Sequence, residues 1–191
     1  MTFPETLPSH IDAAVTAALT AYCRGVDRRD WDLVAAAFHE DAIDDHGVFA
    51  GPVDQLIAWM QERHGAITSS MHVLGQSYRH MTSDRSVAAE TYCVVYQTHR
   101  GDAARQTTGT TLPDDHAGGE SPADVQVQVR CRYLDEVTLV DGVWRIARRT
   151  VIFESQQLEV GVPVPPGSGG TRDANDFSYV LLDGRSVPVR G

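Results

Sequence analysis

Apolar residues recur at helical spacing near the start of the chain. From residue 11 to residue 26 they stand mostly three or four positions apart, which places one apolar stripe along a helix. The stripe consists of Ile11, Val15, Ala18, Leu19, Tyr22 and Val26. Ser9 precedes it as a suitable N-cap, and Gly25 predicts the end of the helix.

Two further helices are predicted before the periodicity changes from that of helices to that of strands. Asp30 is a suitable N-cap for a short helix over Trp31–Phe38. A strand is predicted over Ala42–Phe49, and Gly51 and Pro52 interrupt the regular secondary structure after it. The apolar spacing of Val53–His64 then predicts a third helix, which Gly65 ends.

The second half of the chain alternates with the period of β-strands. The four predicted strands are Ser70–Tyr78, Val87–His99, Val125–Val140 and Trp144–Gln156. Asp141 and Gly142 form a strong hairpin signal between the last two. In the first of these strands, alternation places on one face His72, Leu74, Gln76 and Tyr78.

Helices followed by strands predict a single α+β domain over residues 11–156. Residues 1–10 are predicted to form an N-terminal arm. Residues 100–124 are polar and rich in glycine, and they are predicted to form a mobile loop. Residues 157–191 read as an extended C-terminal tail, in which Phe177–Leu182 can dock on the domain or on a neighbouring copy.

Composition narrows the possible partners. The chain has 191 residues, enough for one core, and a net charge of −10 that argues against nucleic acid and anionic membrane surfaces. Three cysteines without metal-ligand spacing favour a reducing, cytoplasmic location. We find no signal peptide, membrane span or nucleotide fingerprint, and we expect neither cofactor nor metal.

The order of elements and four short motifs resemble the SnoaL-like branch of the nuclear-transport-factor-2-like superfamily. The resemblance covers residues 11 to about 156. Its motifs are Tyr22 with Asp27, the segment from Trp31 to Ala42, Met71-His72-Val73, and Gly142-Val143-Trp144-Arg145. The resemblance implies a cystatin-like, cone-shaped α+β barrel, in which a curved antiparallel sheet wraps around the N-terminal helices and encloses one pocket.

Within this superfamily, the motifs resemble the dehydratase-type branch, which includes scytalone dehydratase, bile acid 7α-dehydratase and hexachlorocyclohexane dehydrochlorinase. That resemblance implies a general base at His72 held by Asp27, with Tyr22 and Arg149 acting on the substrate oxygen or leaving group. An imidazole ordinarily titrates near pH 6.5, so it can accept a proton at neutral pH. The implied function is a cofactor-independent lyase for a small, mostly apolar cyclic substrate.

Each of these four residues also has a purely structural interpretation. His72 can bond to backbone at the start of a strand, Asp27 can cap a helix, Tyr22 can pack in the core, and Arg149 can lie exposed on its strand. Five helical residues turn through about 500°. Tyr22 and Asp27 are therefore expected to share the pocket only if the helix unwinds near Gly25.

Two other functions remain open. In related ketosteroid isomerases a general-base Asp lies close to Asp45, so Asp45 with Tyr22 would make an isomerase or a polyketide-cyclase-like enzyme. His46 is interpreted as a loop residue. The third possibility is a non-catalytic small-molecule-binding or assembly module. Further predicted substrate contacts are Asp45, Trp31, Leu74 and Gln76, and the resemblance implies a homo-oligomer, with a trimer favoured.

Overall fold

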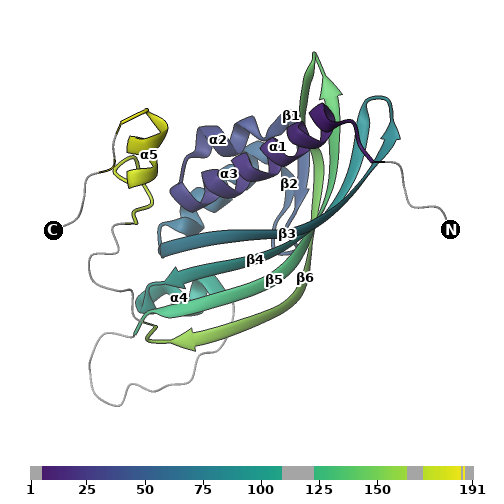
Figure 1. Ribbon diagram of the computed structural model, residues 1–191. Helices are drawn as coiled ribbons and strands as arrows, with labels where there is room; N and C mark the ends of the chain where they lie inside the picture. The colour runs from purple at the N-terminus through teal and green to yellow at the C-terminus, as the bar shows by residue number, and fades with distance from the viewer. Residues whose placement is uncertain (1–5, 109–122, 163–169, 186, 188–191) are drawn as a thin grey trace.

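Helices and sheet form two layers in the computed structural model, which describes residues 6–108, 123–162, 170–185 and 187. The N-terminal helices lie across the concave side of one strongly curved sheet, as Figure 1 shows. The predicted α+β class and curved sheet are confirmed. Within the described residues, no helix is both long and apolar enough to cross a membrane.

Helix α1 (Ser9–Arg28) buries the predicted apolar stripe against the sheet. It begins after Pro8, and no side chain caps its first turn, so the prediction of a Ser9 cap and of an arm reaching residue 10 is wrong. The helix ends where Arg29 adopts a left-handed backbone conformation with a φ of 55°.

Gly25 lies inside α1 and does not end it, contrary to the sequence prediction. A Cβ atom at this position would lie 2.7 Å from Cγ2 of Val34, 2.8 Å from its backbone nitrogen and 2.9 Å from the carbonyl of Asp30. The glycine is therefore needed for close approach between α1 and α2 (Trp31–Ala36). Helix α2 has the predicted cap, because the Asp30 carboxylate accepts from the backbone nitrogen of Leu33 at 3.1 Å.

Short strands and α3 close one side of the layer. Strand β1 (Phe38–Asp45) begins and ends four residues earlier than predicted. It is followed by β2 (Ala50–Pro52) and by α3 (Val53–His64), whose predicted bounds are confirmed.

The sheet has six described strands in the order β2-β1-β6-β5-β4-β3. The long strands are β3 (Ile67–Ser83), β4 (Ser86–His99), β5 (Val125–Val140) and β6 (Val143–Val160). They are joined as antiparallel neighbours, whereas β1 pairs with β6 in parallel. Because β2 and β3 form opposite edges, the sheet is open rather than a closed barrel.

An irregularity in β3 changes which side chains face inward. The register between β3 and β4 shifts between Leu74 and Ser77. Gln76 and Tyr78 are exposed as a result, while the side chains of His72 and Leu74 still pack inward. The predicted single face of His72, Leu74, Gln76 and Tyr78 is therefore wrong after Leu74.

Parts of the predicted loop and tail are regular structure. Helix α4 (Gly101–Thr108) occupies the start of the predicted loop, whose residues 109–122 lie outside the described ranges. Helix α5 (Phe177–Leu182), which Figure 1 shows near the C-terminus, contacts α1 through side chains. Arg24 of α1 donates to Ser178 Oγ at 3.1 Å, and its guanidinium lies 4.8 Å from the ring centre of Tyr179.

We predict that Gly25→Ala destabilises the protein, although alanine is the better helix former. The added Cβ would overlap Val34 and the Asp30 carbonyl, and overpacking of this kind costs about 1–3 kcal/mol. Urea denaturation measures the change in unfolding free energy. The matched substitution Ala17→Gly, on the exposed face of α1, is expected to cost only about 1 kcal/mol. A Gly25→Ala variant more stable than the natural chain would contradict the close-approach explanation.

Candidate active site

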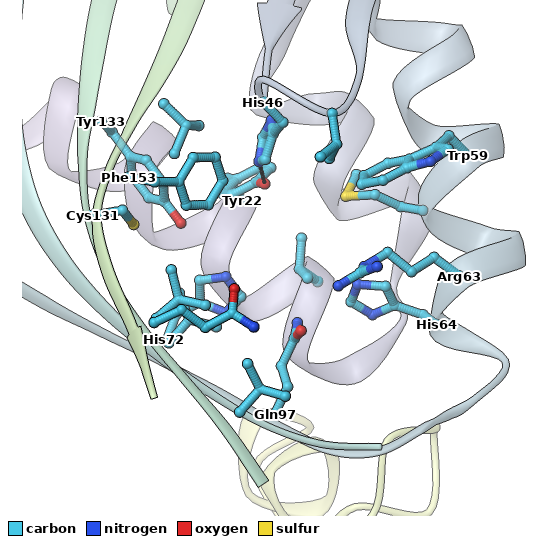
Figure 2. A pocket seen from close by; sticks show the side chains of 18 residues that line it. Tyr22, His46, Trp59, Arg63, His64, His72, Gln97, Cys131, Tyr133 and Phe153 are labelled. Atoms are coloured by element: carbon cyan, nitrogen blue, oxygen red, sulfur yellow. Dashed lines mark hydrogen bonds between the residues drawn. The ribbon is translucent and has the colours of Figure 1, made fainter. Parts of the chain in front are cut away.

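A cavity of about 460 Å³ lies between the concave face of the sheet and helices α1 and α3. This volume is within the usual range for small-molecule sites. Its lining comes from both layers, as Figure 2 shows. It consists of Tyr22, Val26, His46, Val48, Trp59, Met60, Arg63, His64, His72, Val95, Gln97, Val127, Val129, Cys131, Tyr133, Val151, Phe153 and Gln156. The wall is mostly apolar, with a few polar side chains.

Asp27 holds His72 at one side of this cavity. The Nδ1 atom of His72 lies 2.7 Å from Oδ1 of Asp27, and the backbone nitrogen of His72 donates to Oδ2 at 2.8 Å. The hydroxyl of Ser70 donates to Oδ1 at 2.7 Å. Burial acts to raise the pKa of Asp27, but the hydrogen bonds from His72 and Ser70 outweigh it and lower the pKa below its ordinary value. The carboxylate is therefore ionised at neutral pH.

The contact with Asp27 fixes the state of the imidazole. A carboxylate only accepts hydrogen bonds, so Nδ1 of His72 carries the proton and Nε2 is the basic nitrogen. The side chain of His72 is 5% exposed and borders the cavity. The dyad forms without unwinding of α1. Tyr22 and Val26, one turn apart, line the cavity, and Asp27 reaches sideways to β3.

Tyr22 lies between the layers at the base of the cavity. Its ring is 1% exposed and makes edge-to-face contacts with His72 and Tyr133, at 6.2 Å and 5.9 Å between ring centres. Burial raises the pKa of Tyr22 well above its ordinary value, and the carboxylate of Asp44 adds to the rise, although Arg149 opposes it. The phenol therefore stays protonated and can donate a hydrogen bond.

Arg149 lies behind Tyr22 and is fully buried. It forms a two-pronged ion pair with Asp135, with Nε–Oδ1 at 2.7 Å and a second contact to Oδ2 at 2.9 Å. The guanidinium lies 4.2 Å from the ring centres of both Tyr22 and Tyr133. Burial opposes its charge, but the Asp135 carboxylate raises the pKa of Arg149 well above its ordinary value. Arg149 is not part of the cavity lining.

A second histidine that lines the cavity is paired with a buried carboxylate behind it, and the sequence analysis predicted neither as a site residue. His46 follows β1, and its Nδ1 atom forms a very short contact with Oδ1 of Asp44. Its Nε2 atom lies 3.2 Å from the hydroxyl of Tyr22, as the dashed line in Figure 2 marks. His46 is thus a cavity residue and not only a loop residue. The available signal was the spacing of two residues, which in an extended chain places both side chains on the same side.

The comparisons with known proteins agree with this architecture. Residues 9–150 match the family described as the SnoaL-like domain. The chain belongs to this SnoaL-like family. The prediction of this family and of its superfamily is confirmed. No curated protein matches the sequence.

Several solved structures share the SnoaL-like fold at low sequence identity. A type 2 hexachlorocyclohexane dehydrochlorinase is 15% identical, with a TM-score of 0.66 over 83% of this chain and 96% of its own. A type 3 dehydrochlorinase from Novosphingobium barchaimii is 16% identical, with a TM-score of 0.63 over 83% and 97%. A candidate scytalone dehydratase from Novosphingobium aromaticivorans is 14% identical, with a TM-score of 0.60 over 84% and 97%.

The other predicted substrate contacts of this SnoaL-like domain lie outside the cavity lining. Asp45 accepts from the backbone nitrogen of Gly47 at 2.8 Å and so stabilises the turn after β1. Trp31 packs edge-on against His64 at 5.7 Å between ring centres. Leu74 packs against the core, and Gln76 is turned outward by the irregularity in β3.

The C-terminal segment reaches the back of the site through Arg172. Its guanidinium donates to the carbonyls of Val26 at 2.7 Å, Asp27 at 3.0 Å and Ile67 at 2.8 Å. It also lies 2.7 Å from Nδ1 of His64. Arginine is only a donor, so Nδ1 of His64 accepts and Nε2 carries the proton. Burial, together with Arg172 and Arg63, lowers the pKa of His64 to about 2.

Among the described residues, no group of three or more His, Cys, Asp or Glu side chains is arranged to hold a metal ion. The three cysteines are free and buried. The polar atoms available to a ligand therefore come from histidine, tyrosine, arginine and glutamine side chains of the lining.

We predict that the free energy of unfolding falls on acidification below pH 6.5. Two buried histidines stay neutral in the folded chain, whereas they become protonated in the unfolded chain. Burial lowers the pKa of His64 to about 2 and that of His99 to about 4. Each such histidine costs up to about 1.4 kcal/mol of unfolding free energy per pH unit in this window. Urea denaturation at pH 7, 6 and 5 should show a shallower loss for His64→Gln. The exposed His80→Gln should leave the slope unchanged, and equal slopes for all three proteins would contradict the assignment.

We also predict that Arg149→Met is strongly destabilising, because it leaves the Asp135 carboxylate buried without its counter-charge. Such a loss typically costs about 3–5 kcal/mol. The double variant Arg149→Met, Asp135→Leu should recover much of this loss in thermal and urea unfolding. Arg148→Met, exposed on the same strand, is the control. A small effect of Arg149→Met alone would show that the pair contributes little.

Proposed function

We propose that the protein is a cofactor-independent lyase that eliminates water or another small leaving group from a small, mostly apolar cyclic substrate. The observation that carries the proposal is the contact between Asp27 and His72 at the wall of an apolar cavity. Membership of the SnoaL-like family and the shared fold with dehydrochlorinases support it. This reaction needs a positioned base and a proton donor, and both types of group line the cavity.

His72 acts as the general base in this proposal. Its Nε2 atom removes a proton from a carbon that a neighbouring carbonyl makes acidic. The electrons of the broken C–H bond form the new double bond as the bond to the leaving group breaks. The Asp27 carboxylate stabilises the imidazolium that results and keeps the ring in one orientation. Base catalysis of this kind is worth about 10²–10⁴-fold in rate.

Tyr22 acts on the oxygen of the leaving group in this proposal. Its protonated hydroxyl donates to the departing oxygen, so that hydroxide leaves as water. The resemblance implied that Arg149 handles the leaving group. We now propose a positioning role instead, because Arg149 is 0% exposed and holds the rings of Tyr22 and Tyr133 from behind. Val127, Val129 and Val151 supply the apolar surface that the substrate ring contacts.

The isomerase alternative loses its expected base, since the carboxylate of Asp45 is bonded to the turn and does not line the cavity. A non-catalytic binding module needs no dyad at its cavity, so His72 and Asp27 favour the lyase.

A trimeric assembly and a cytoplasmic location remain predictions from the resemblance and from the free cysteines. Sedimentation measurements and fractionation of the producing cells would check them.

We predict that His72→Gln lowers turnover at least about 100-fold while the melting temperature changes little. The substrates to test are cyclic β-hydroxy ketones, whose elimination products are enones with strong ultraviolet absorbance. The substituted amide side chain cannot take up a proton, yet the backbone nitrogen that donates to Asp27 is retained. Asp27→Asn should lower kcat in the same direction, because an amide cannot stabilise the imidazolium.

His80→Gln, an exposed substitution on the same strand, serves as the control and should retain full activity. Retention of activity by His72→Gln would overturn the base assignment. A large fall in melting temperature would instead show that His72 is a structural residue. Crystals soaked with the enone product would show whether the reacting carbon lies within about 3.5 Å of Nε2.

A further inference from the structure

His46 and Asp44 repeat the arrangement of His72 and Asp27 on the opposite side of Tyr22. In both pairs a carboxylate contacts Nδ1 and leaves Nε2 to make other contacts. The ring centre of Tyr22 lies 6.5 Å from that of His46 and 6.2 Å from that of His72. Both histidines line the same cavity. One base suffices for the proposed elimination, so the second pair needs its own explanation.

The backbone around His46 is tightly held, which fixes the direction of its side chain. The backbone nitrogen of His46 donates to the carbonyl of Phe49 at 2.7 Å, and the nitrogen of Val48 donates to the carbonyl of His46 at 2.7 Å. Gly47 between them has a φ of 71°, a left-handed conformation that glycine adopts without strain. The turn therefore presents Nε2 of His46 to Tyr22 at 3.2 Å.

Asp44 favours a positive charge on His46. Its side chain is 0% exposed, and within the described residues its Oδ2 atom is buried without a hydrogen-bond partner. A buried carboxylate is costly unless a positive charge lies against it. Arg149 stands opposite Asp44 in the register of β1 and β6, but it directs its Nε and Nη2 atoms to Asp135. The imidazole of His46 is in direct contact with Asp44, and protonation would supply the missing charge.

The charge on His46 decides which way the Tyr22 hydroxyl points. A neutral His46 with its proton on Nδ1 would accept the hydrogen of Tyr22 at Nε2. A protonated His46 donates to the phenol oxygen at the same distance of 3.2 Å. The hydroxyl hydrogen of Tyr22 is then free to donate into the cavity, where a leaving oxygen would lie.

We propose that Asp44, His46 and Tyr22 form an acid relay that protonates the leaving group, opposite the base His72. This inference rests on the proposed lyase function. Tyr22 gives its proton to the departing hydroxide, which leaves as water, and His46 Nε2 returns a proton to Tyr22. His72 has meanwhile gained the proton from carbon. Exchange with solvent after product release restores the charged His46 and the neutral His72.

The charged and titratable groups around the contact between His46 and Tyr22 come from four elements. They are Tyr22 of α1, Asp44 of β1, Asp135 of β5 and Arg149 of β6. The two carboxylates favour the charged imidazole, and Arg149 disfavours it. The direct contact with Asp44 is the shortest of these, so removal of its charge has the largest effect on His46.

A first experiment tests the relay without any substrate. The protein is labelled with ¹⁵N-histidine, and ring-nitrogen spectra are recorded from pH 5 to pH 9, with His46→Gln used to assign the His46 signals. We expect both nitrogens of His46 to be protonated at pH 7 in the natural chain. In Asp44→Asn we expect His46 to lose its charge at a pH at least one unit lower than in the natural chain. A neutral His46 at pH 7 in the natural chain would overturn the proposal.

A second experiment measures the leaving-group dependence with 3-hydroxycyclohexanone and 3-acetoxycyclohexanone, which both give cyclohexenone. Acetate leaves without help from an acid, whereas hydroxide needs a proton. His46→Gln is therefore expected to lower kcat about 100-fold for the hydroxy compound and less than about fivefold for the acetoxy compound. His72→Gln should lower both rates. Equal losses for both compounds in His46→Gln would refute the acid role.

His39→Gln is the matched control, because this β1 histidine bonds to the carbonyl of Thr138 at 3.0 Å and does not line the cavity. It should leave the ratio of the two rates unchanged. If His72→Gln is inactive while His46→Gln is fully active on the hydroxy compound, the lyase function stands and the relay fails. If the natural chain turns over neither compound, the ¹⁵N spectra still decide the charge of His46.

Discussion

The Asp27 carboxylate ties the last turn of α1 to the start of β3, and the geometry of the site depends on that link. It receives three hydrogen bonds from β3, two of them from His72 and one from Ser70. A helix end and a strand that meet through one ionised group cannot slide without exposing that group unpaired. The same contact sets the imidazole tautomer, so one carboxylate both joins the two elements and orients the base.

Periodicity predicted the helices and the curved sheet because burial of one apolar face determines both. It failed where an extra residue interrupts a ladder. Gln76 faces outward after the irregularity in β3. Counting back from the hairpin turn would pair Asp135 with Arg148, but an irregularity beside Val137 makes Arg149 its partner. Such one-residue shifts exchange the two faces of a strand, and no local pattern announces them.

The candidate site was predicted in part, and the residues that were not predicted are the polar pair His46 and Asp44. Family resemblance supplied His72 and Asp27, which the structure brings together. His46 was overlooked because its neighbours Asp45 and Gly47 look like turn residues, and they are. What the pattern could not show is that Asp44, one residue earlier, is buried while Asp45 is not. Asp44 and Asp45 are neighbours in one strand, so their local sequences are nearly identical. Only the tertiary structure determines that Asp44 is covered and Asp45 is not.

Arg172 is the last described residue to reach the site, 145 positions after Asp27, whose carbonyl it binds. It also holds the carbonyl of Val26 and the ring of His64. Synthesis proceeds from the N-terminus, and domains begin to fold in that order. The helices and the sheet can therefore form before Arg172 binds the end of α1. The contacts of Arg172 with the end of α1 thus form after the elements they join, and completion of the site is a late step of folding.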